Sequence, residues 1–321
     1  MYIDQVHINS KSPVMVMLVG LPGSGKSTLA KNIYCKVNGR FEAVSHIHSS
    51  DKIREMLYGD ENIQGDSNVV FRTLHNNIKE DLRNGHSVIY DATNVKRKNR
   101  ISFLNELKNI DCTKVAVVVA TPVAICVERN NNRTRRVPNE VIYKMLSSYC
   151  PPHKSEGFDE VRHVFTSLEE LKIWEALDMA DTFDQHNSHH TLTLGGHLMK
   201  TADYLRNCKE DGNLYLAGWL HDIGKLFTQS KVDSRGYMSD DYHYYNHEHV
   251  GAYYAMFMLK NNKYNISDED ISDITNLIAY HMYPYSAWKN SEKSKQRDLE
   301  ILGVEDFNRI MKLHEADSQA H

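Results

Sequence analysis

The chain has 321 residues, more than one typical domain needs, and 41% of them are hydrophobic, which suffices for ordinary cores. No apolar stretch approaches the length of a membrane-spanning helix, and the N-terminus carries no apolar signal segment, so we expect a cytoplasmic protein with no membrane partner. The five cysteines are scattered and form no CxxC pair, which excludes a disulfide frame or a zinc ribbon and indicates reduced thiols.

The net charge of −4 is unevenly divided along the chain. Residues 1–165 hold 23 Lys and Arg against 17 Asp and Glu, a balance of +6, whereas residues 166–321 hold 15 against 25, a balance of −10. A basic first half suits polyanionic ligands. The second half also carries 11 of the 18 histidines, and histidines with carboxylates form the ligand set of divalent metals.

The first half alternates apolar strands with amphipathic helices. Strands are predicted at Val14–Val19, Ala43–His48, Ser87–Asp91, Lys114–Ala120 and Val161–Phe165. Helices are predicted at Lys26–Lys36, Asp51–Tyr58, Asn68–Asn84, Lys98–Leu107, Val123–Asn130 and Pro138–Ser148. This alternation is typical of an α/β domain whose parallel sheet has helices on both faces.

The second half has a different pattern. From Leu192 onward we find amphipathic helical periods and no convincing strand, so we predict an all-α domain. The sequence therefore divides into a first domain over 1–165, a linker over 166–188 and a second domain over 189–321. The linker includes a predicted helix over Leu168–Met179, followed by a polar stretch.

A phosphate-binding loop follows the first predicted strand. The segment Gly20–Thr28 has the pattern GxxxxGK[ST], in which glycines let the backbone curl so that its N–H groups point at phosphate oxygens. Lys26 supplies charge to the β- and γ-phosphates, and the hydroxyl of Ser27 supplies a ligand to Mg²⁺. We therefore predict a site for ATP or another nucleoside triphosphate with Mg²⁺, built from Gly23, Ser24, Gly25, Lys26, Ser27 and Thr28.

Polar residues follow the next strands. Asp51 and Arg54 are three residues apart at the start of a helix and so share one face. A carboxylate there can take the proton from an attacking hydroxyl, and an arginine beside it can hold a phosphate of the acceptor. Asp91 and Asn94 close a later strand, where ligands of open α/β sheets bind. Taken alone, each pair also suits a helix start or an Asx turn.

Four arginines in eight residues precede the helix at Pro138: Arg129, Arg133, Arg135 and Arg136. Like charges this dense repel one another unless an anion lies between them. The cluster is typical of a mobile lid that neutralises charge on a transferred phosphoryl group.

Residues 13–165 resemble the phage-type polynucleotide 5′-kinases among P-loop kinases, through the GLPGSGKST loop, Asp51-x-x-Arg54, the DATN strand end and the arginine lid. The resemblance implies that Asp51 is the general base toward a 5′-hydroxyl and that Arg54 holds the acceptor's 3′ phosphate. It further implies that Arg133 contacts the donor phosphates, with Arg129 beside the same nucleotide; the division of work among the lid arginines stays open. Small-molecule kinases of related branches share the loop and the strand end.

The second half turns single histidines and aspartates toward apolar helix faces. His221 is in phase with Leu214 and Ala217, and comparable faces carry His197, His281 and Asp317. A carboxylate on an apolar face is costly unless it is paired or metal-bound. A shared metal therefore explains why these four residues all face the core. A single histidine on an apolar face is more often a core residue whose hydrogen bonds are made within the protein.

The order His197, His221-Asp222, Asp317 resembles the HD phosphohydrolase superfamily. The LHDIGK, NHEHVGA and LIAYHM segments are similar to the HD domain of bacterial tRNA CCA-adding enzymes. The resemblance implies that His197, His221, Asp222 and Asp317 bind a divalent metal, with Mn²⁺, Mg²⁺, Co²⁺ and Ni²⁺ left open. It assigns His247 and His281 to a second metal or to the scissile phosphate, with His249 as the alternative to His247, and Lys225 to phosphoryl charge.

Together the two resemblances predict an enzyme that heals broken nucleic-acid ends. The kinase would phosphorylate a 5′-hydroxyl of single-stranded RNA or DNA, and the HD domain would remove a 2′,3′-cyclic, 2′- or 3′-phosphate. A ligase acting downstream is a candidate partner. Two alternatives stay open: a small-metabolite or nucleoside kinase fused to a nucleotide phosphohydrolase, and a non-catalytic nucleotide switch on a metal-stabilised scaffold.

Overall fold

The computed structural model describes residues 5–167, 173–186, 192–261 and 266–320. It divides into two compact units. The first comprises Met1–Met145 with Glu156–Ser167, and the second comprises Leu146–Ser155 with Leu168–His321. None of the described helices combines the length and the apolar composition that crossing a membrane requires.

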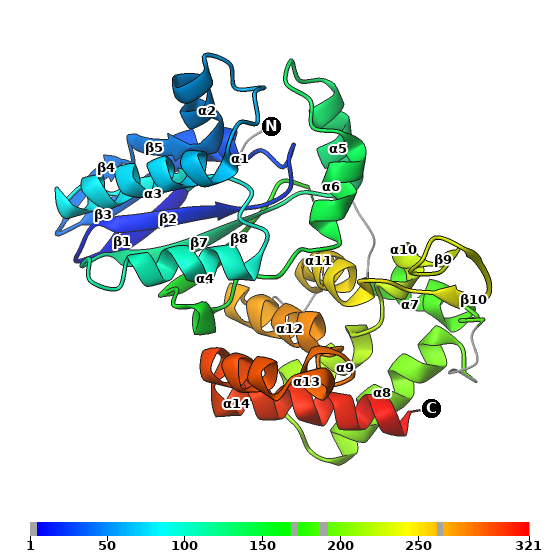
Figure 1. The fold of residues 1–321 in the computed structure, drawn as a ribbon. Helices are drawn as coiled ribbons and strands as arrows, with labels where there is room; N and C mark the ends of the chain where they lie inside the picture. The colour runs from blue at the N-terminus through cyan, green and yellow to red at the C-terminus, as the bar shows by residue number, and fades with distance from the viewer. Residues whose placement is uncertain (1–4, 168–172, 187–191, 262–265, 321) are drawn as a thin grey trace. The chain divides into compact units, whose positions relative to one another are not determined.

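The first unit is built on a five-stranded parallel sheet in the order β5-β6-β2-β7-β8 (Figure 1). Its strands are β2 (Val14–Val19), β5 (His46–Ser49), β6 (Val88–Asp91), β7 (Thr113–Ala120) and β8 (Glu160–Phe165). β2 lies at the centre, and all six of its side chains are buried. The predicted parallel α/β domain is confirmed, with the second strand shifted to begin at His46.

The longer helices that lie mainly in this unit are α2 (Ser50–Tyr58), α3 (Ser67–Arg83), α4 (Arg97–Glu106), α5 (Val123–Asn131) and α6 (Asn139–Leu146). They lie where the sequence predicts helices, within a few residues at each end. α3 and α4 cover the face of the sheet that carries Tyr90, because His75 of α3 and Phe103 of α4 contact that ring.

The helix predicted over Lys26–Lys36 is wrong. α1 spans only Lys26–Leu29, a 3₁₀ turn covers Ala30–Asn32, and the chain then forms strand β3 (Ile33–Val37). β3 alternates buried and more exposed residues, as β-branched and aromatic side chains favour. Asn38 and Gly39 follow with φ of +50° and +83°, the backbone of a tight hairpin turn, and lead into β4 (Arg40–Ala43).

These strands join β1 (Val6–Ser10) in a small sheet of order β1-β3-β4. The small sheet packs through Val6, Ile8, Ile33 and Cys35 against the face of the large sheet opposite α3 and α4. β3 of this small sheet thus takes the place of the second half of the predicted helix.

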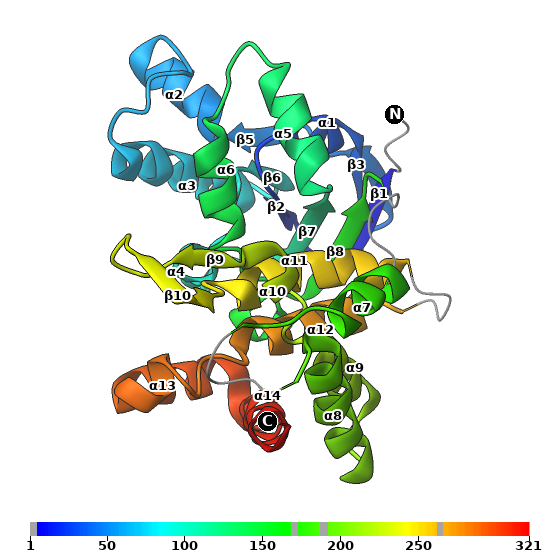
Figure 2. The ribbon, with the colours of Figure 1, turned by 90° about the vertical axis from the view of Figure 1, so that its right-hand side faces the viewer.

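The second unit is helical, as predicted (Figure 2). Its helices are α7 (Ile173–Asp181), α8 (Leu194–Asn207), α9 (Gly212–Leu220), α10 (Lys225–Thr228), α11 (His247–Lys260), α12 (Asp268–Tyr280), α13 (Ala287–Asn290) and α14 (Glu292–Gln319). α8 packs beside α9 and α14, and α11 beside α12. The first part of the predicted helix Leu168–Met179 lies outside the described residues, and its end coincides with α7.

Two features of this unit differ from the expectations. One is a hairpin of β9 (Ser230–Val232) and β10 (Met238–His243), turned by Asp233, whose carboxylate accepts from the N–H groups of Arg235 and Tyr237. Most of its side chains are exposed, so the apolar alternation that marks a strand in sequence is missing.

The other feature is the segment 146–155, which the sequence analysis assigned to the first domain. Here it packs with the second unit. The ring of Tyr149 meets that of Tyr253 edge-on at 5.0 Å between centroids, and the hydroxyl of Ser272 donates to the carbonyl of Pro152 over 2.8 Å.

Candidate active sites

The phosphate-binding loop has the backbone that its glycines predict. Gly23 and Gly25 have φ of +82° and +99°, where other residues are strained, and a Cβ on Gly23 would collide with the carbonyl of Cys126. The ammonium of Lys26 is buried and donates to the carbonyls of Gly20 (3.0 Å) and Leu21 (2.8 Å). Burial lowers the pKa of Lys26, while nearby Asp91 opposes that effect.

The end of β6 is tied to this loop. The N–H of Gly20 donates to the carbonyl of Thr93, and the side chain of Asn94 donates to the carbonyl of Leu18 over 2.9 Å. Asn94 therefore shapes the loop. Asp91 is buried close enough to act on Lys26, whereas Ser27 and Thr28 are exposed and available to a nucleotide.

Asp51 and Arg54 meet at the start of α2. The hydroxyl of Ser49 caps the helix by accepting from the N–H of Asp51, and Nη1 of Arg54 donates to Oδ1 of Asp51 over 2.8 Å. Arg135 of the arginine segment forms an ion pair with the same oxygen. Arg54 is only 9% exposed, and its Nε has no hydrogen-bond partner among the described residues. A buried N–H normally donates to an acceptor, so the Nε of Arg54 is available to a ligand.

The other lid arginines lie closer to the loop. Arg133 is near enough to Lys26 to lower the pKa of that ammonium further, and Arg129 reaches within 3.9 Å of where a Cβ on Gly25 would lie. Asn130 is fully buried and holds both the N–H and the carbonyl of Val137, closing the intervening segment into a loop. Sequence reasoning missed Asn130 because it is one of three consecutive asparagines.

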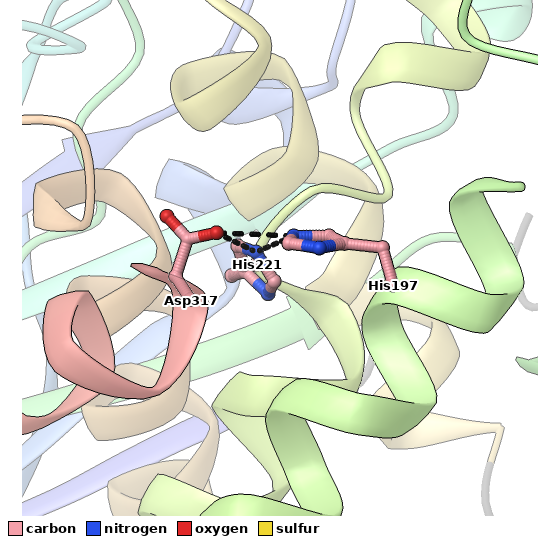
Figure 3. A group of neighbouring side chains, drawn as sticks. All are labelled: His197, His221 and Asp317. Atoms are coloured by element: carbon pink, nitrogen blue, oxygen red, sulfur yellow. Dashed lines mark hydrogen bonds and ion pairs between the residues drawn. The ribbon is translucent and has the colours of Figure 1, made fainter. Parts of the chain in front are cut away.

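Figure 3 shows three side chains of the second unit converging from different helices. His197 lies in α8, His221 follows α9, and Asp317 lies near the end of α14. Nε2 of His197 lies 3.2 Å from Nε2 of His221 and 3.0 Å from Oδ1 of Asp317, which is 3.6 Å from Nε2 of His221. Two imidazole nitrogens and a carboxylate facing one small volume form a ligand set for a divalent metal.

A second group of three lies beside the first. Nε2 of His247 and Nε2 of His281 are 3.2 Å apart, and they lie 2.9 and 3.3 Å from Oδ1 of Asp222. The other oxygen, Oδ2, lies 3.5 Å from Nε2 of His197 and 3.6 Å from Nε2 of His221. Asp222 therefore joins the two groups, and all six side chains are buried.

The hydrogen bonds of the histidines fit metal binding. Nδ1 of His221, His247 and His281 each lies 2.7–2.9 Å from the backbone carbonyl three residues earlier. A carbonyl only accepts, so Nδ1 must carry the proton and Nε2 keeps its lone pair for the centre.

The charges of the centre favour ionised carboxylates. Burial alone would raise the pKa of Asp222, but the ammonium of Lys225 and the neighbouring histidines hold it well below its usual range. Burial would likewise raise the pKa of Asp317, and the neighbouring imidazoles of His197 and His221 lower it instead. These carboxylates are thus charged and ready to bind a cation.

Residues around the ligands orient them. The hydroxyl of Tyr285 donates to Oδ2 of Asp317 over 2.9 Å, which leaves Oδ1 to face His197. Lys225, 5% exposed, donates to Oδ2 of Asp222 over 2.6 Å and to Oε1 of fully buried Gln185 over 2.8 Å. Sequence reasoning missed Tyr285 and Gln185, because neither lies in a recognisable pattern.

The structure separates the two candidates for the outer histidine position. His247 lies in the second group, whereas Nδ1 of His249 faces Sγ of Cys150 at 3.8 Å and its Nε2 lies 3.9 Å from Glu248. His247 is therefore the residue that can serve the centre. His314 contacts the ring of Tyr285 edge-on and belongs to neither group.

Comparisons with known families match each half of the chain to a different family model. Residues 15–152 match a family model described as an AAA domain, and residues 188–307 match one described as an HD domain. The chain thus joins a P-loop kinase-like domain to an HD domain. Asp317 lies beyond the matched segment, so its place in the centre rests on the geometry above.

Among curated proteins, the chain is 32% identical over 148 residues to the L-seryl-tRNA(Sec) kinase of Methanococcus maripaludis, covering 46% of this chain and 56% of the relative. It is 24% identical over 155 residues to Protein KTI12 of Saccharomyces cerevisiae, covering 45% and 49%. The chain therefore spans about half the length of these relatives. A solved gluconokinase from Sinorhizobium meliloti 1021 is 19% identical with a TM-score of 0.32, covering 49% of this chain and 85% of that one.

Proposed function

We propose that this protein heals broken nucleic-acid ends. Its kinase domain transfers the γ-phosphoryl group of ATP to a 5′-hydroxyl, and its HD domain removes a 2′,3′-cyclic, 2′- or 3′-phosphate. The observation that carries the kinase half is the pairing of Asp51 with Arg54 beside the arginine segment. The six-residue His/Asp centre carries the other half.

The acceptor corner suits a hydroxyl next to a phosphate. Oδ1 of Asp51 is held by Arg54 and Arg135, which leaves Oδ2 as the atom to accept the hydroxyl proton. Arg54 carries a buried donor without a partner among the described residues, which fits a phosphate of the acceptor strand. One relative is named as a kinase of L-seryl-tRNA(Sec), a substrate that contains RNA, and we extend RNA as a class of acceptor to this chain.

The kinase residues divide the remaining work. The loop N–H groups and Lys26 hold the β- and γ-phosphates, and the hydroxyl of Ser27 suits Mg²⁺. Arg129 and Arg133, next to the loop and Lys26, stabilise negative charge on the transferred group.

The HD centre fits divalent metal. The residues that would hold it are His197, His221 and Asp317 on one side, and His247 and His281 on the other, with Asp222 between. Bound metal would lower the pKa of a water molecule and polarise the phosphate. Lys225 contributes a positive charge at Asp222 that can also meet a phosphate oxygen, and the surrounding helices exclude bulk water.

One experiment tests both halves. An RNA with a 5′-hydroxyl and a 2′,3′-cyclic phosphate is incubated with ATP and a series of divalent metals, and both ends are identified. We expect a new 5′-phosphate and a free 3′ end. Lys26→Ala should abolish only the first product, and Asp222→Asn only the second.

Several outcomes would contradict the proposal. Preferred phosphorylation of free nucleosides or small polyols over oligonucleotides would indicate the small-metabolite kinase instead. Nucleotide binding without turnover in either domain would indicate a regulatory switch.

A further inference from the structure

The small sheet β1-β3-β4 has two unlike faces. Along each strand, alternate side chains point to opposite sides. One side carries Val6, Ile8, Ile33 and Cys35 into the core of the first unit. The other side carries His7, Tyr34, Lys36 and Phe41, of which Tyr34 is half-buried and the other three are exposed.

Three aromatic rings gather on this outer face, and we call them the ring cluster: His7, Tyr34 and Phe41. Their centroids are 5.7, 5.2 and 5.5 Å apart, and their planes differ by 2–25°. Because the three distances between centroids are nearly equal, the rings form a triangle and not a linear stack. Phe41 is 56% exposed and offers a ring face to an outside partner.

The charge of the outer face favours a polyanion. Lys36 is exposed and lies directly opposite Phe41 in the register of β3 and β4. Arg40 and Glu42 lie on the other side of β4, opposite Val37 and Cys35, so Lys36 is the charged residue of β3 and β4 on the outer face. Burial raises the pKa of Cys35 to about 11, and the charge of Glu42 adds to that shift. This agrees with Glu42 lying on the same side of the sheet as Cys35.

We propose that this face binds single-stranded nucleic acid, with bases stacked on the ring cluster and a backbone phosphate held by Lys36. Parallel rings beside cations are the arrangement that single strands favour, because every base has a π-face and every nucleotide a phosphate. This inference rests on the proposed function, in which single-stranded nucleic acid is the substrate. On this proposal, the part of the acceptor strand that follows the reacting 5′ end lies on the small sheet β1-β3-β4.

The test measures binding of the full-length protein to a fluorescently labelled single-stranded RNA, in EDTA and without ATP so that neither site turns over. Phe41→Leu keeps an apolar side chain and removes the ring. We expect it to weaken binding about 5- to 150-fold, the loss that one stacked base produces. Phe41→Tyr should bind like the wild type. Lys36→Ala should lower the salt dependence of log K by about one unit of slope.

A matched control is Tyr237→Ala, which removes a ring that is 70% exposed in the hairpin of the other unit and should leave binding unchanged. Wild-type protein that does not bind the RNA, or Phe41→Leu that binds as well as wild type, would overturn the inference. So would sedimentation showing that Phe41→Leu dissociates a dimer without affecting RNA binding, since the face would then join two copies of the chain.

The same variants separate this inference from the proposed function. Phosphorylation of a nucleoside 3′-phosphate, which has no further base to stack on the ring cluster, should be equal in Phe41→Leu and wild type. Loss of kinase activity toward every 5′-hydroxyl, with RNA binding still dependent on Phe41, would refute the proposed function and leave the binding face standing.

Discussion

The two sites of this chain are assembled in opposite ways. The phosphate loop takes its shape from nine consecutive residues, Gly20–Thr28, and mostly from their backbone. The His/Asp centre takes six side chains from residues 197–317, carried on or beside separate helices and fully enclosed. The shape of the first site is therefore set largely by local residues, whereas the second exists only once the helices have packed.

The largest expected effect comes from the residue that joins both metal groups. Asp222→Asn keeps the shape of the side chain and removes its charge and one ligand oxygen. Changes outside the ligand shell typically cost about 10–100-fold in metal affinity, so we expect this change to cost more than about 100-fold in the proposed phosphatase activity. Metal content by mass spectrometry should fall at both groups. Unchanged metal content would show that Asp222 does not bridge them.

The phosphate-binding loop, whose shape comes mainly from its backbone, can be tested by adding one methyl group. Gly23→Ala places a Cβ against the carbonyl of Cys126 at a positive φ, so we expect ATP binding to weaken by about 10–100-fold, with the metal centre unaffected. Gly85→Ala is the matched control, because Gly85 has φ of +84° but nothing within contact distance. Calorimetry with a non-hydrolysable ATP analogue measures both variants. Equal affinities would mean that the loop can shift without cost.

The orienting shell of the metal centre is tested by Tyr285→Phe. Loss of the hydroxyl frees Oδ2 of Asp317, so metal affinity should fall about 10-fold while the fold is kept. Tyr204→Phe removes a similar hydrogen bond to Glu315, two residues earlier on the same helix, and serves as the control. Competition with a metal indicator gives the affinities. An equal loss in both variants would point to α14 as a whole.

The smallest effect concerns the stability of the first unit at low pH. Burial lowers the pKa of His75, and Glu106 opposes the shift, so the ring is neutral when folded. The unfolded chain takes up the proton first as pH falls below about 6.5, which lowers the free energy of unfolding. Thermal unfolding of the metal-free protein should show this decline, and His75→Gln should reduce its slope. A slope that stays the same would assign the decline to other groups.

Local patterns explain what could be predicted. The strand, loop and glycine order of the phosphate site, the pairing of Asp51 with Arg54, and the apolar helix faces that carry the histidines all depend on spacing within one segment. The main local error was the helix over Lys26–Lys36, where the Asn38-Gly39 turn signal and the alternation of Ile33–Val37 outweighed the motif's usual helix. The catalytic roles of Asp51, Arg54 and Arg133 stay predictions.

Other features depend on contacts between distant segments. Arg135 reaches Asp51, Gln185 reaches Lys225, and Tyr285 reaches Asp317, and none of these pairs shares a helical face or a turn. The choice of His247 over His249 could not be predicted either. The two residues point to opposite sides of one helix, and only the packing of neighbouring segments decides which side faces the centre.

By itself the sequence determined that the chain binds a nucleoside triphosphate on an α/β sheet and carries a His/Asp set on helices, since glycine conformations and helical periods are properties of short segments. Tertiary structure alone decided that Asp222 lies between two groups of ligands, and that β1, β3 and β4 form a sheet with an exposed ring cluster. Distances between segments far apart in the chain follow from how the core packs, and packing is a property of the whole fold.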